Sequence, residues 1–469
     1  MNINRLLHTS EQEAFLTAIH SHSDRSVRLH VSRSVSSLPF ATIPVPWNAS
    51  GRFLVDSSLR PAAFLQYATA DYYIQDAGSL LPVSLLDPQP GETICDLCAS
   101  PGGKASAIVE RLGSEGFLLA NESIRSRVDV LKYALARTGN PSFAVCSYDP
   151  EDLARLVPQA FDAVLVDAPC SGQMLVGRSK RDTNAFSENQ IEHCAQRQQR
   201  ILQSAIRLLK PGGRLIYSTC TFAEEENESQ IQWLQDQSPG SWLPLLSKQL
   251  EPWQSPRLPG CYRLWPHRDK CAGGFAAGLR LINDLDSSIA PSRSRAQADR
   301  ETQFKSPFNS SLSRRELEQR SAKAQSMLQE LGNVQGLELR GHGGQLQAIA
   351  SGAVRFLSTY SLLSTDSLSL VIETGNHWVP THGLSLLDRR YFEPFQVLEL
   401  ATNQAIPFAN GVSIPRDPTM RPSASEKASG HTSSAWVQAV WQGRPLGWCK
   451  ALSNRLNNHI PPWARLNLA

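Results

Sequence analysis

Residues 93–104 read TICDLCASPGGK, and this stretch decides how the rest of the chain is interpreted. Thr93–Cys98 is an apolar, strand-like run, and the two glycines behind it lead into a helix-like stretch. A strand, a glycine-rich loop and a helix start present backbone N–H groups where open α/β sheets bind ligands. The segment therefore predicts a ligand-binding loop from Cys98 to Lys104, oriented by Asp96. A plain turn that needs glycine is the alternative.

A β-α-β pattern continues from this loop. Further strand-like runs lie at Gly116–Ala120, Phe143–Cys146, Ala163–Val166 and Arg214–Ser218, and helical stretches separate them. This alternation is typical of a parallel sheet covered by helices. Short strand-like segments around Trp242, Tyr262–Trp265 and Phe275–Ile282 predict an antiparallel edge. We expect a Rossmann-like α/β domain over residues 71–285.

The flanking segments differ in composition. Residues 1–70 predict a small α+β extension with a helix from Ser10 and a strand in Ser26–Ser32, whereas the IPVPW segment at Ile43–Trp47 should break regular structure. Residues 286–325 are rich in serine and poor in large apolar residues, which predicts a flexible linker. Residues 326–469 alternate β-like runs with Gly and Pro turns, which predicts a mostly β domain.

Composition excludes several classes of protein. The 469 residues contain no apolar run near the roughly 18 residues of a membrane helix, and the first residues lack a secretory signal. We expect a cytoplasmic protein, and we expect a monomer. Nine cysteines, an odd number at irregular spacing, indicate free thiols. The net charge of +3 does not by itself indicate nucleic-acid binding, so any basic surface must be confined to a part of the molecule.

Two cysteines follow neighbouring strand-like runs. The fourth run leads into Asp167 and Cys170, and the fifth leads into Cys220. Paired strands lie about 4.8 Å apart, so the two thiols should share one site at the ligand end of the sheet. A thiolate that adds to carbon 6 of a pyrimidine makes carbon 5 nucleophilic, and a second acid/base group then helps release. Two buried structural cysteines are the alternative.

Other polar residues suit the same chemistry. Lys104 is a candidate cation beside the attacking thiol, and Asp167 could hydrogen-bond the base. Glu122, at the end of the second run, suits ribose hydroxyls. A zinc site at Cys95 and Cys98 is rejected because no second ligand pair completes it, so we expect no metal.

Three motifs carry a family resemblance. DLCASPGGK at 96–104, DAPCSG at 167–172 and YSTCT at 217–221, followed by EENE at 225–228, resemble the signatures of the Sun-family RNA (cytosine-5)-methyltransferases. The C-terminal LGWCK at 446–450 resembles the ending of the F type of 16S small-subunit ribosomal RNA methyltransferases, whose tail is a PUA-like RNA-binding module.

The resemblance implies a class I methyltransferase domain that methylates carbon 5 of a cytosine in RNA, and the likeness to the F type implies that this RNA is 16S ribosomal RNA. It implies Cys220 as the nucleophile and Cys170 as the group assisting release. The cofactor implied is S-adenosylmethionine, held by Cys98, Ala99, Ser100, Pro101, Gly102, Gly103, Lys104, Glu122, Asp149 and Asp167.

Basic and aromatic residues could contact RNA, and three other functions remain as alternatives. Basic residues that could contact RNA phosphates are Arg178, Lys180, Arg181, Arg197, Arg200, Arg263, Arg268 and Lys270. Four tryptophans, Trp436, Trp441, Trp448 and Trp463, could stack on bases but are expected in the core of a β domain. The alternatives are a transfer RNA methyltransferase, a DNA cytosine methyltransferase using Cys170, and a non-catalytic ribosome-assembly factor.

Overall fold

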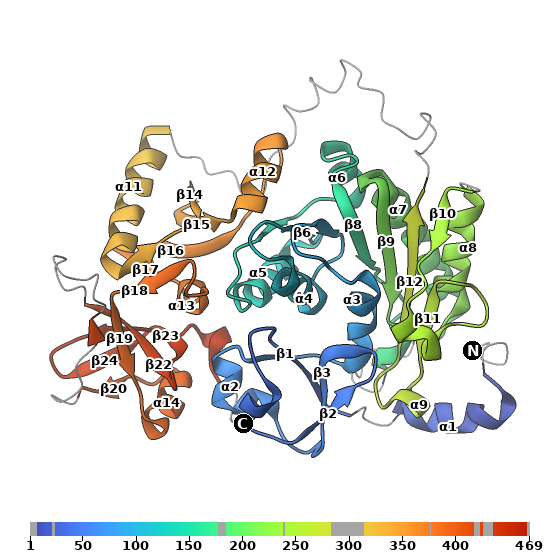
Figure 1. Ribbon diagram of the computed structural model, residues 1–469, viewed down its shortest axis with the longest axis horizontal. Coiled ribbons are helices and arrows are strands. Elements are labelled where there is room, and N and C mark those ends of the chain that lie inside the picture. The colour runs from blue at the N-terminus through green and yellow to red at the C-terminus, as the bar shows by residue number, and fades with distance from the viewer. Residues whose placement is uncertain are drawn as a thin grey trace.

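The computed structural model describes residues 7–20, 24–176, 184–237, 240–282, 314–375, 377–416, 423–424 and 435–466. Its central feature is an eight-stranded sheet in the order β10-β12-β9-β8-β5-β6-β7, with β11 paired to β12 (Figure 1). The parallel strands are β5 (Thr93–Asp96), β6 (Phe117–Asn121), β7 (Phe143–Cys146), β8 (Phe161–Asp167) and β9 (Leu209–Thr219). The antiparallel strands are β10 (Trp242–Pro244), β11 (Cys261–Leu264) and β12 (Gly274–Leu281). The predicted α/β domain with an antiparallel edge is confirmed.

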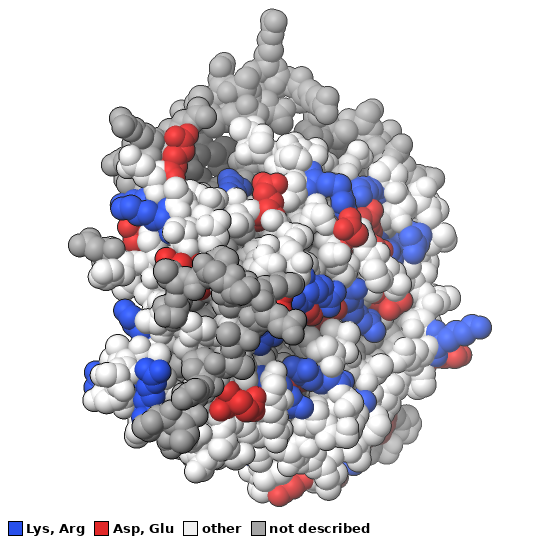
Figure 2. Space-filling view, turned by 60° about the vertical axis from the view of Figure 1, so that its left-hand side comes forward, with Lys and Arg blue, Asp and Glu red and all other residues white. Residues whose placement is uncertain are grey.

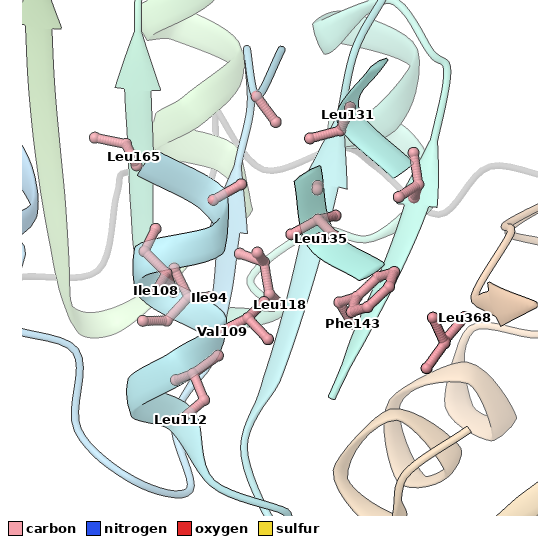
Figure 3. Close-up of a cluster of buried hydrophobic side chains, with 14 of the residues drawn as sticks. Ile94, Ile108, Val109, Leu112, Leu118, Leu131, Leu135, Phe143, Leu165 and Leu368 are labelled. Carbon is pink, nitrogen blue, oxygen red and sulfur yellow. The ribbon is translucent and has the colours of Figure 1, made fainter. Parts of the chain in front are cut away.

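Helices cover both faces of this sheet because its strands are apolar on both sides. One face packs against α3 (Leu81–Leu86), α4 (Gly103–Leu112) and α5 (Val128–Ala136). Figure 3 shows side chains of α4 and α5 meeting Ile94, Leu118 and Leu165 from the strands. The other face packs against α6 (Pro150–Leu156), α7 (Glu188–Leu208) and α8 (Glu228–Gln237). Ile124 lies before α5 and is exposed.

The N-terminal extension divides into two parts. Its sheet has the order β2-β3-β1-β4, formed by β1 (Ser26–Leu29), β2 (Thr42–Val45), β3 (Asn48–Leu54) and β4 (Tyr72–Ile74). The prediction that the proline-rich segment breaks regular structure is wrong: β2 is an edge strand, where a proline without an N–H is tolerated. Helix α1 (Thr9–His20) instead packs on α9 (Pro266–Asp269) of the α/β domain, with Phe15 against Phe222 and Trp265.

The C-terminal half contains two sheet units. The first runs from 314 to 394 and has α11 (Arg314–Leu331), α12 (Ser351–Thr359), α13 (His382–Leu386) and the strands β13 (Gly332–Val334), β14 (Glu338–His342), β15 (Gln345–Ile349), β16 (Leu368–Thr374), β17 (His377–Pro380) and β18 (Phe392–Pro394). The second has α14 (Thr402–Ala409) and a six-stranded sheet of β19 (Gln396–Glu399), β20 (Ile414–Pro415), β21 (Ser423–Ala424), β22 (Trp436–Trp441), β23 (Arg444–Ala451) and β24 (Arg455–Asn458).

Helix α11 overlaps the end of the predicted linker. Residues 314–325 are helical and α11 packs against its own unit through Ala324 and Leu328, whereas the rest of the linker lies outside the described residues. Among the helices that the structure describes, none combines the length and apolar character needed to cross a bilayer.

Candidate active site

The glycine loop connects the end of β5 to the start of α4. Gly102 has a φ of +108°, and a Cβ at this position would lie 2.5 Å from the Ala134 Cβ of α5. Only glycine fits both this backbone conformation and this close approach. The loop is thereby pressed against α5, at the carboxyl end of the parallel strands.

An arginine ties this loop to the end of β6. Arg127 donates to the Ser100 carbonyl oxygen at 2.7 Å, and its guanidinium lies 3.3 Å from the buried carboxylate of Glu122. Glu122 also accepts from the Ile124 backbone N–H at 2.9 Å. Asp149, exposed after β7, caps α6 by accepting from the Glu151 N–H. The predicted cofactor residues thus lie together at the carboxyl ends of the parallel strands.

Lys104 and Asp167 form an ion pair between α4 and β8. The Lys104 Nζ lies 2.7 Å from Asp167 Oδ2, and Ser218 Oγ of β9 donates to Asp167 Oδ1 at 2.7 Å. Although burial by itself lowers the pKa of Lys104, the carboxylates of Asp167 and Asp96 raise it above its usual range. Lys104 is therefore a cation, and Asp167 is its ion-pair partner.

The two predicted thiols are in contact. Cys170 Sγ and Cys220 Sγ lie 3.0 Å apart, and the Cys220 backbone N–H donates to Cys170 Sγ at 3.2 Å. The hydrogen bond with Cys220, followed by burial, raises the pKa of the Cys170 thiol well above its ordinary value. Cys170 is therefore neutral at pH 7 and placed to exchange a proton beside Cys220.

A buried glutamate, which the motifs did not single out, connects the two thiol loops. Glu226 accepts from the backbone N–H and the hydroxyl of Ser171, at 2.9 and 2.5 Å, and from Gln198 Nε2 at 2.8 Å. The Ser171 hydroxyl also lies 2.8 Å from the Thr221 hydroxyl. Since Ser171 and Thr221 follow the two cysteines directly, this network fixes the distance between the thiols. The EENE run contained the residue, but no periodicity distinguished its two buried acids, Glu226 and Glu228, from the exposed Glu225.

The predicted RNA-contacting residues differ in exposure and in their partners. Arg263 is buried in an ion pair with Glu228, and Arg268 is paired with Glu11 of α1. Arg197, Arg200 and Lys270 are exposed, whereas residues 178, 180 and 181 lie outside the described residues. On the face shown in Figure 2, Lys and Arg side chains are interspersed with Asp and Glu. Three of the four tryptophans are core residues as expected, but Trp463 is 51% exposed and packs on Tyr133.

Asp96, at the end of β5, is a buried carboxylate for which no hydrogen bond to either oxygen is found among the described residues. That Asp96 orients the glycine loop stays a prediction, and an interaction with the Cys98 backbone N–H of that loop lowers the pKa of its carboxyl group. Burial and the nearby Asp167 raise the pKa of Asp96 to about 8, against the opposing effect of Lys104. An unpartnered carboxylate beside the loop suits a ligand that brings cationic or hydroxyl donors.

Asp96 predicts a pH dependence of stability. Because its pKa is raised in the folded chain, the folded state binds the proton more tightly than the unfolded state between about pH 4 and pH 8. Its contribution to stability is thus fully present below that window and is lost as pH rises through it, by at most about 1.4 kcal/mol per pH unit. Urea unfolding at several pH values should show a smaller loss for Asp96→Asn; an equal loss in both proteins would contradict this assignment.

No group of three or more His, Cys, Asp or Glu side chains is arranged to hold a metal within the part of the chain that the structure describes.

The Rossmann-like sheet and the two thiols at neighbouring strand ends define the class of this protein as a methyltransferase. The comparison with known proteins agrees with this class. Residues 83–280 match the family described as 16S rRNA methyltransferase RsmB/F, and residues 395–466 match the RsmF PUA domain of methyltransferases. The resemblance to Sun-family RNA methyltransferases, of the RsmF type, is confirmed, as is the fold with a Rossmann-like domain and a C-terminal PUA domain.

Particular relatives carry the name Ribosomal RNA small subunit methyltransferase F. The protein from Enterobacter is 33% identical over 295 residues, which are 60% of this chain and 61% of that protein. The protein from Klebsiella pneumoniae is 36% identical over 256 residues, 53% of this chain and 54% of that one. The chain thus matches between about half and three fifths of the length of these relatives.

Solved structures support the fold. The crystal structure of PH0851 is 28% identical with a TM-score of 0.53, covering 58% of this chain and 63% of that chain. The structure of NSun6 from Pyrococcus horikoshii with SFG has a TM-score of 0.51 at 18% identity, covering 60% of this chain and 97% of that chain. The latter likeness concerns the fold alone.

Proposed function

We propose that this protein methylates carbon 5 of a cytosine in small-subunit ribosomal RNA, with S-adenosylmethionine as the cofactor. The observation that carries the proposal is the contact of Cys170 and Cys220, 3.0 Å apart, beside the Lys104–Asp167 pair. The names of the relatives support ribosomal RNA as the substrate, and the PUA-domain match supports a role of the C-terminal sheet in binding it.

The residues present fit the cofactor. S-adenosylmethionine has an ammonium group and ribose hydroxyls, and the strand ends offer the carboxylates of Asp96, Glu122 and Asp149 as acceptors. Gly102 lets the loop pack closely on Ala134 of α5, which holds the loop at the carboxyl end of the parallel strands. We assign cofactor binding to the loop from Cys98 to Lys104 together with Glu122, Asp149 and Asp167. When bound, the cofactor supplies the methyl group on a sulfonium.

The chain's own residues then divide the chemistry. The Cys220 thiolate forms a bond to carbon 6 of the cytosine, and the electron pair displaced by this addition makes carbon 5 nucleophilic. Asp167, held by Lys104 and Ser218, hydrogen-bonds the edge of the base and stabilises the adduct. After carbon 5 is methylated, it loses its proton to a base, the carbon 5–carbon 6 double bond re-forms, and the Cys220–carbon 6 bond breaks. Cys170 assists this release: its thiol donates a proton to the departing Cys220 sulfur, and the Cys170 thiolate so formed is the base that takes the carbon 5 proton.

The test uses purified full-length protein, methyl-labelled S-adenosylmethionine and three substrates: 16S ribosomal RNA, small ribosomal subunits and transfer RNA. We expect 5-methylcytosine in the ribosomal RNA or the subunits. Methylation of transfer RNA alone would overturn the proposed substrate. Binding to RNA without any methyl transfer would favour the assembly-factor alternative over an enzyme. The cytoplasmic location and the monomeric state stay expectations from the sequence.

Glu226 provides a prediction on the release step. Glu226→Gln keeps the size of the side chain but turns one acceptor oxygen into a donor, so it cannot receive all the bonds from Ser171 and Gln198. We expect Cys170 to be misplaced and adduct release to slow by about tenfold, the value of one lost buried hydrogen bond. Single-turnover kinetics should show this without a change in the Kd for S-adenosylmethionine.

Glu225→Gln is the matched control, because Glu225 is the exposed neighbour in the same EENE run. If both variants release the adduct at the wild-type rate, Glu226 does not position Cys170.

A further inference from the structure

Residues 364–366, which precede β16, lie along β7, the outermost strand of the parallel sheet. Val145 of β7 and Asp366 exchange two backbone hydrogen bonds, with N–O distances of 2.7 and 2.8 Å. A strand at the edge of a sheet otherwise presents unpaired N–H and C=O groups. This segment, which we call the buttress loop, therefore covers part of the edge of the catalytic sheet.

The Asp366 side chain fixes the buttress loop from two directions. Its Oδ2 lies 2.6 Å from Lys132 Nζ of α5, and its Oδ1 accepts from Gln347 Nε2 of β15 at 2.6 Å. Leu368, just beyond the loop, belongs to the same buried cluster as Phe143 of β7, and Figure 3 shows it beside that ring. Because the carboxylate is almost fully buried and paired on both sides, the loop has one defined position on the sheet.

The same loop reaches the corner that carries Asp149. The Ser364 backbone N–H donates to the Tyr148 hydroxyl at 3.0 Å. The backbone N–H and carbonyl of Tyr148 are both bonded to the Asn121 side chain, at 3.0 Å each. Asn121 directly precedes Glu122. The proposed cofactor ligands Glu122 and Asp149 therefore directly follow two residues, Asn121 and Tyr148, that are bonded to each other. The buttress loop contacts this pair through the Tyr148 hydroxyl.

We propose that the buttress loop is part of the cofactor site, and that Tyr148 and Asp366 are positioning residues for S-adenosylmethionine. This inference rests on the proposed function. It assigns a role to the unit at 314–394, which lies between the two family matches at 83–280 and 395–466. The unit connects to the catalytic domain at the cofactor end of β7, so cofactor affinity depends on a segment outside the methyltransferase domain.

The test measures S-adenosylmethionine binding to the full-length chain by calorimetry, without RNA. Tyr148→Phe keeps the buried ring and removes only the acceptor for the Ser364 N–H. The net value of one hydrogen bond corresponds to roughly 2- to 10-fold in an equilibrium constant, so we expect the Kd to rise by that factor. Asp366→Ala should raise it further, because it also frees the loop from Lys132 and Gln347. Binding of 16S ribosomal RNA without cofactor should not change.

Arg355→Ala is the control for contacts between the unit at 314–394 and the α/β domain that lie away from the cofactor loops. Arg355 of the same unit pairs with Glu115 at 2.8 Å, before β6 and thus at the opposite end of the parallel strands from the cofactor loops. We expect this variant to bind S-adenosylmethionine like wild type. Wild-type Kd values for Tyr148→Phe and Asp366→Ala, or an equal loss in Arg355→Ala, would overturn the inference.

Two further outcomes are distinguishable. If Asp366→Ala fails to fold, Tyr148→Phe alone decides, since it changes no packing volume. If the wild-type chain does not bind S-adenosylmethionine at all, the proposed function fails, and the role of the buttress loop fails with it.

Discussion

Cys220→Ala should reduce methyl transfer to background and should leave no RNA attached to the protein under denaturing conditions. The expected loss is complete because the reaction depends on a covalent bond from this sulfur to carbon 6, and alanine has no nucleophile. The Cys170 thiol, 3.0 Å away in the wild type, cannot replace it, since burial and the nearby Glu226 still raise its pKa without the Cys220 partner and keep it protonated at neutral pH. Transfer is measured with methyl-labelled S-adenosylmethionine and 16S ribosomal RNA.

Cys170→Ala should instead accumulate the covalent complex of protein and RNA. The bond to Cys220 can still form and carbon 5 can still be methylated, but release lacks the group that exchanges a proton beside Cys220. We therefore expect a labelled RNA–protein complex that survives denaturing electrophoresis and accumulates with time. Turnover should fall by at least about 10²-fold, the lower end of the 10²–10⁴-fold range of general acid–base assistance.

Cys194→Ala controls for the loss of any thiol, because this cysteine is buried on α7 and forms its sulfur contact with Gln190. It should methylate RNA like wild type. The converse pattern, with Cys170→Ala inert and Cys220→Ala trapped as a complex, would assign the nucleophile to the Cys170 loop. That result would support the DNA-type alternative and contradict the proposed mechanism.

Much of the catalytic domain could be predicted because its determinants are local. Parallel strands that are buried on both faces are short apolar runs, so each predicted run overlaps the strand observed at that place; Phe143–Cys146 agrees at both ends. The meeting of Cys170 and Cys220 followed from one step of topology, that the strands before them are neighbours. Edge positions were harder, since Pro44 is compatible with a strand only where no partner requires its N–H.

The parts that could not be predicted depend on contacts between distant segments. Asp366 looks like an ordinary loop acid in the sequence, and only the packing of its unit places it between Lys132 and Val145. Arg263 looks like a surface cation, yet it is buried with Glu228. Charge alone does not reveal which ionic residues have a partner, and burial without one is costly, so the pairing decides the role.

Asp167→Asn is expected to lower kcat by roughly 10²- to 10³-fold, the scale of a lost acid–base or charge contact to the reacting base. The variant keeps the shape of the side chain but no longer balances Lys104, whose ammonium lies 2.7 Å from Asp167 Oδ2. The Kd for RNA should change by less than about threefold, since phosphate contacts elsewhere supply most of that affinity. Kinetics and filter binding on the same preparations separate the two quantities.

Ser218→Ala is the matched comparison, because it removes the donor to Asp167 Oδ1 and leaves the charge in place. We expect a loss of less than about tenfold, which corresponds to one hydrogen bond. The pH profile distinguishes the two further. In wild type the carboxylates of Asp167 and Asp96 outweigh burial and raise the pKa of Lys104, so removing the Asp167 charge should lower that pKa. Activity of Asp167→Asn should therefore decline at a lower alkaline pH than that of Ser218→Ala, and identical alkaline limits would show that the pair does not act through charge.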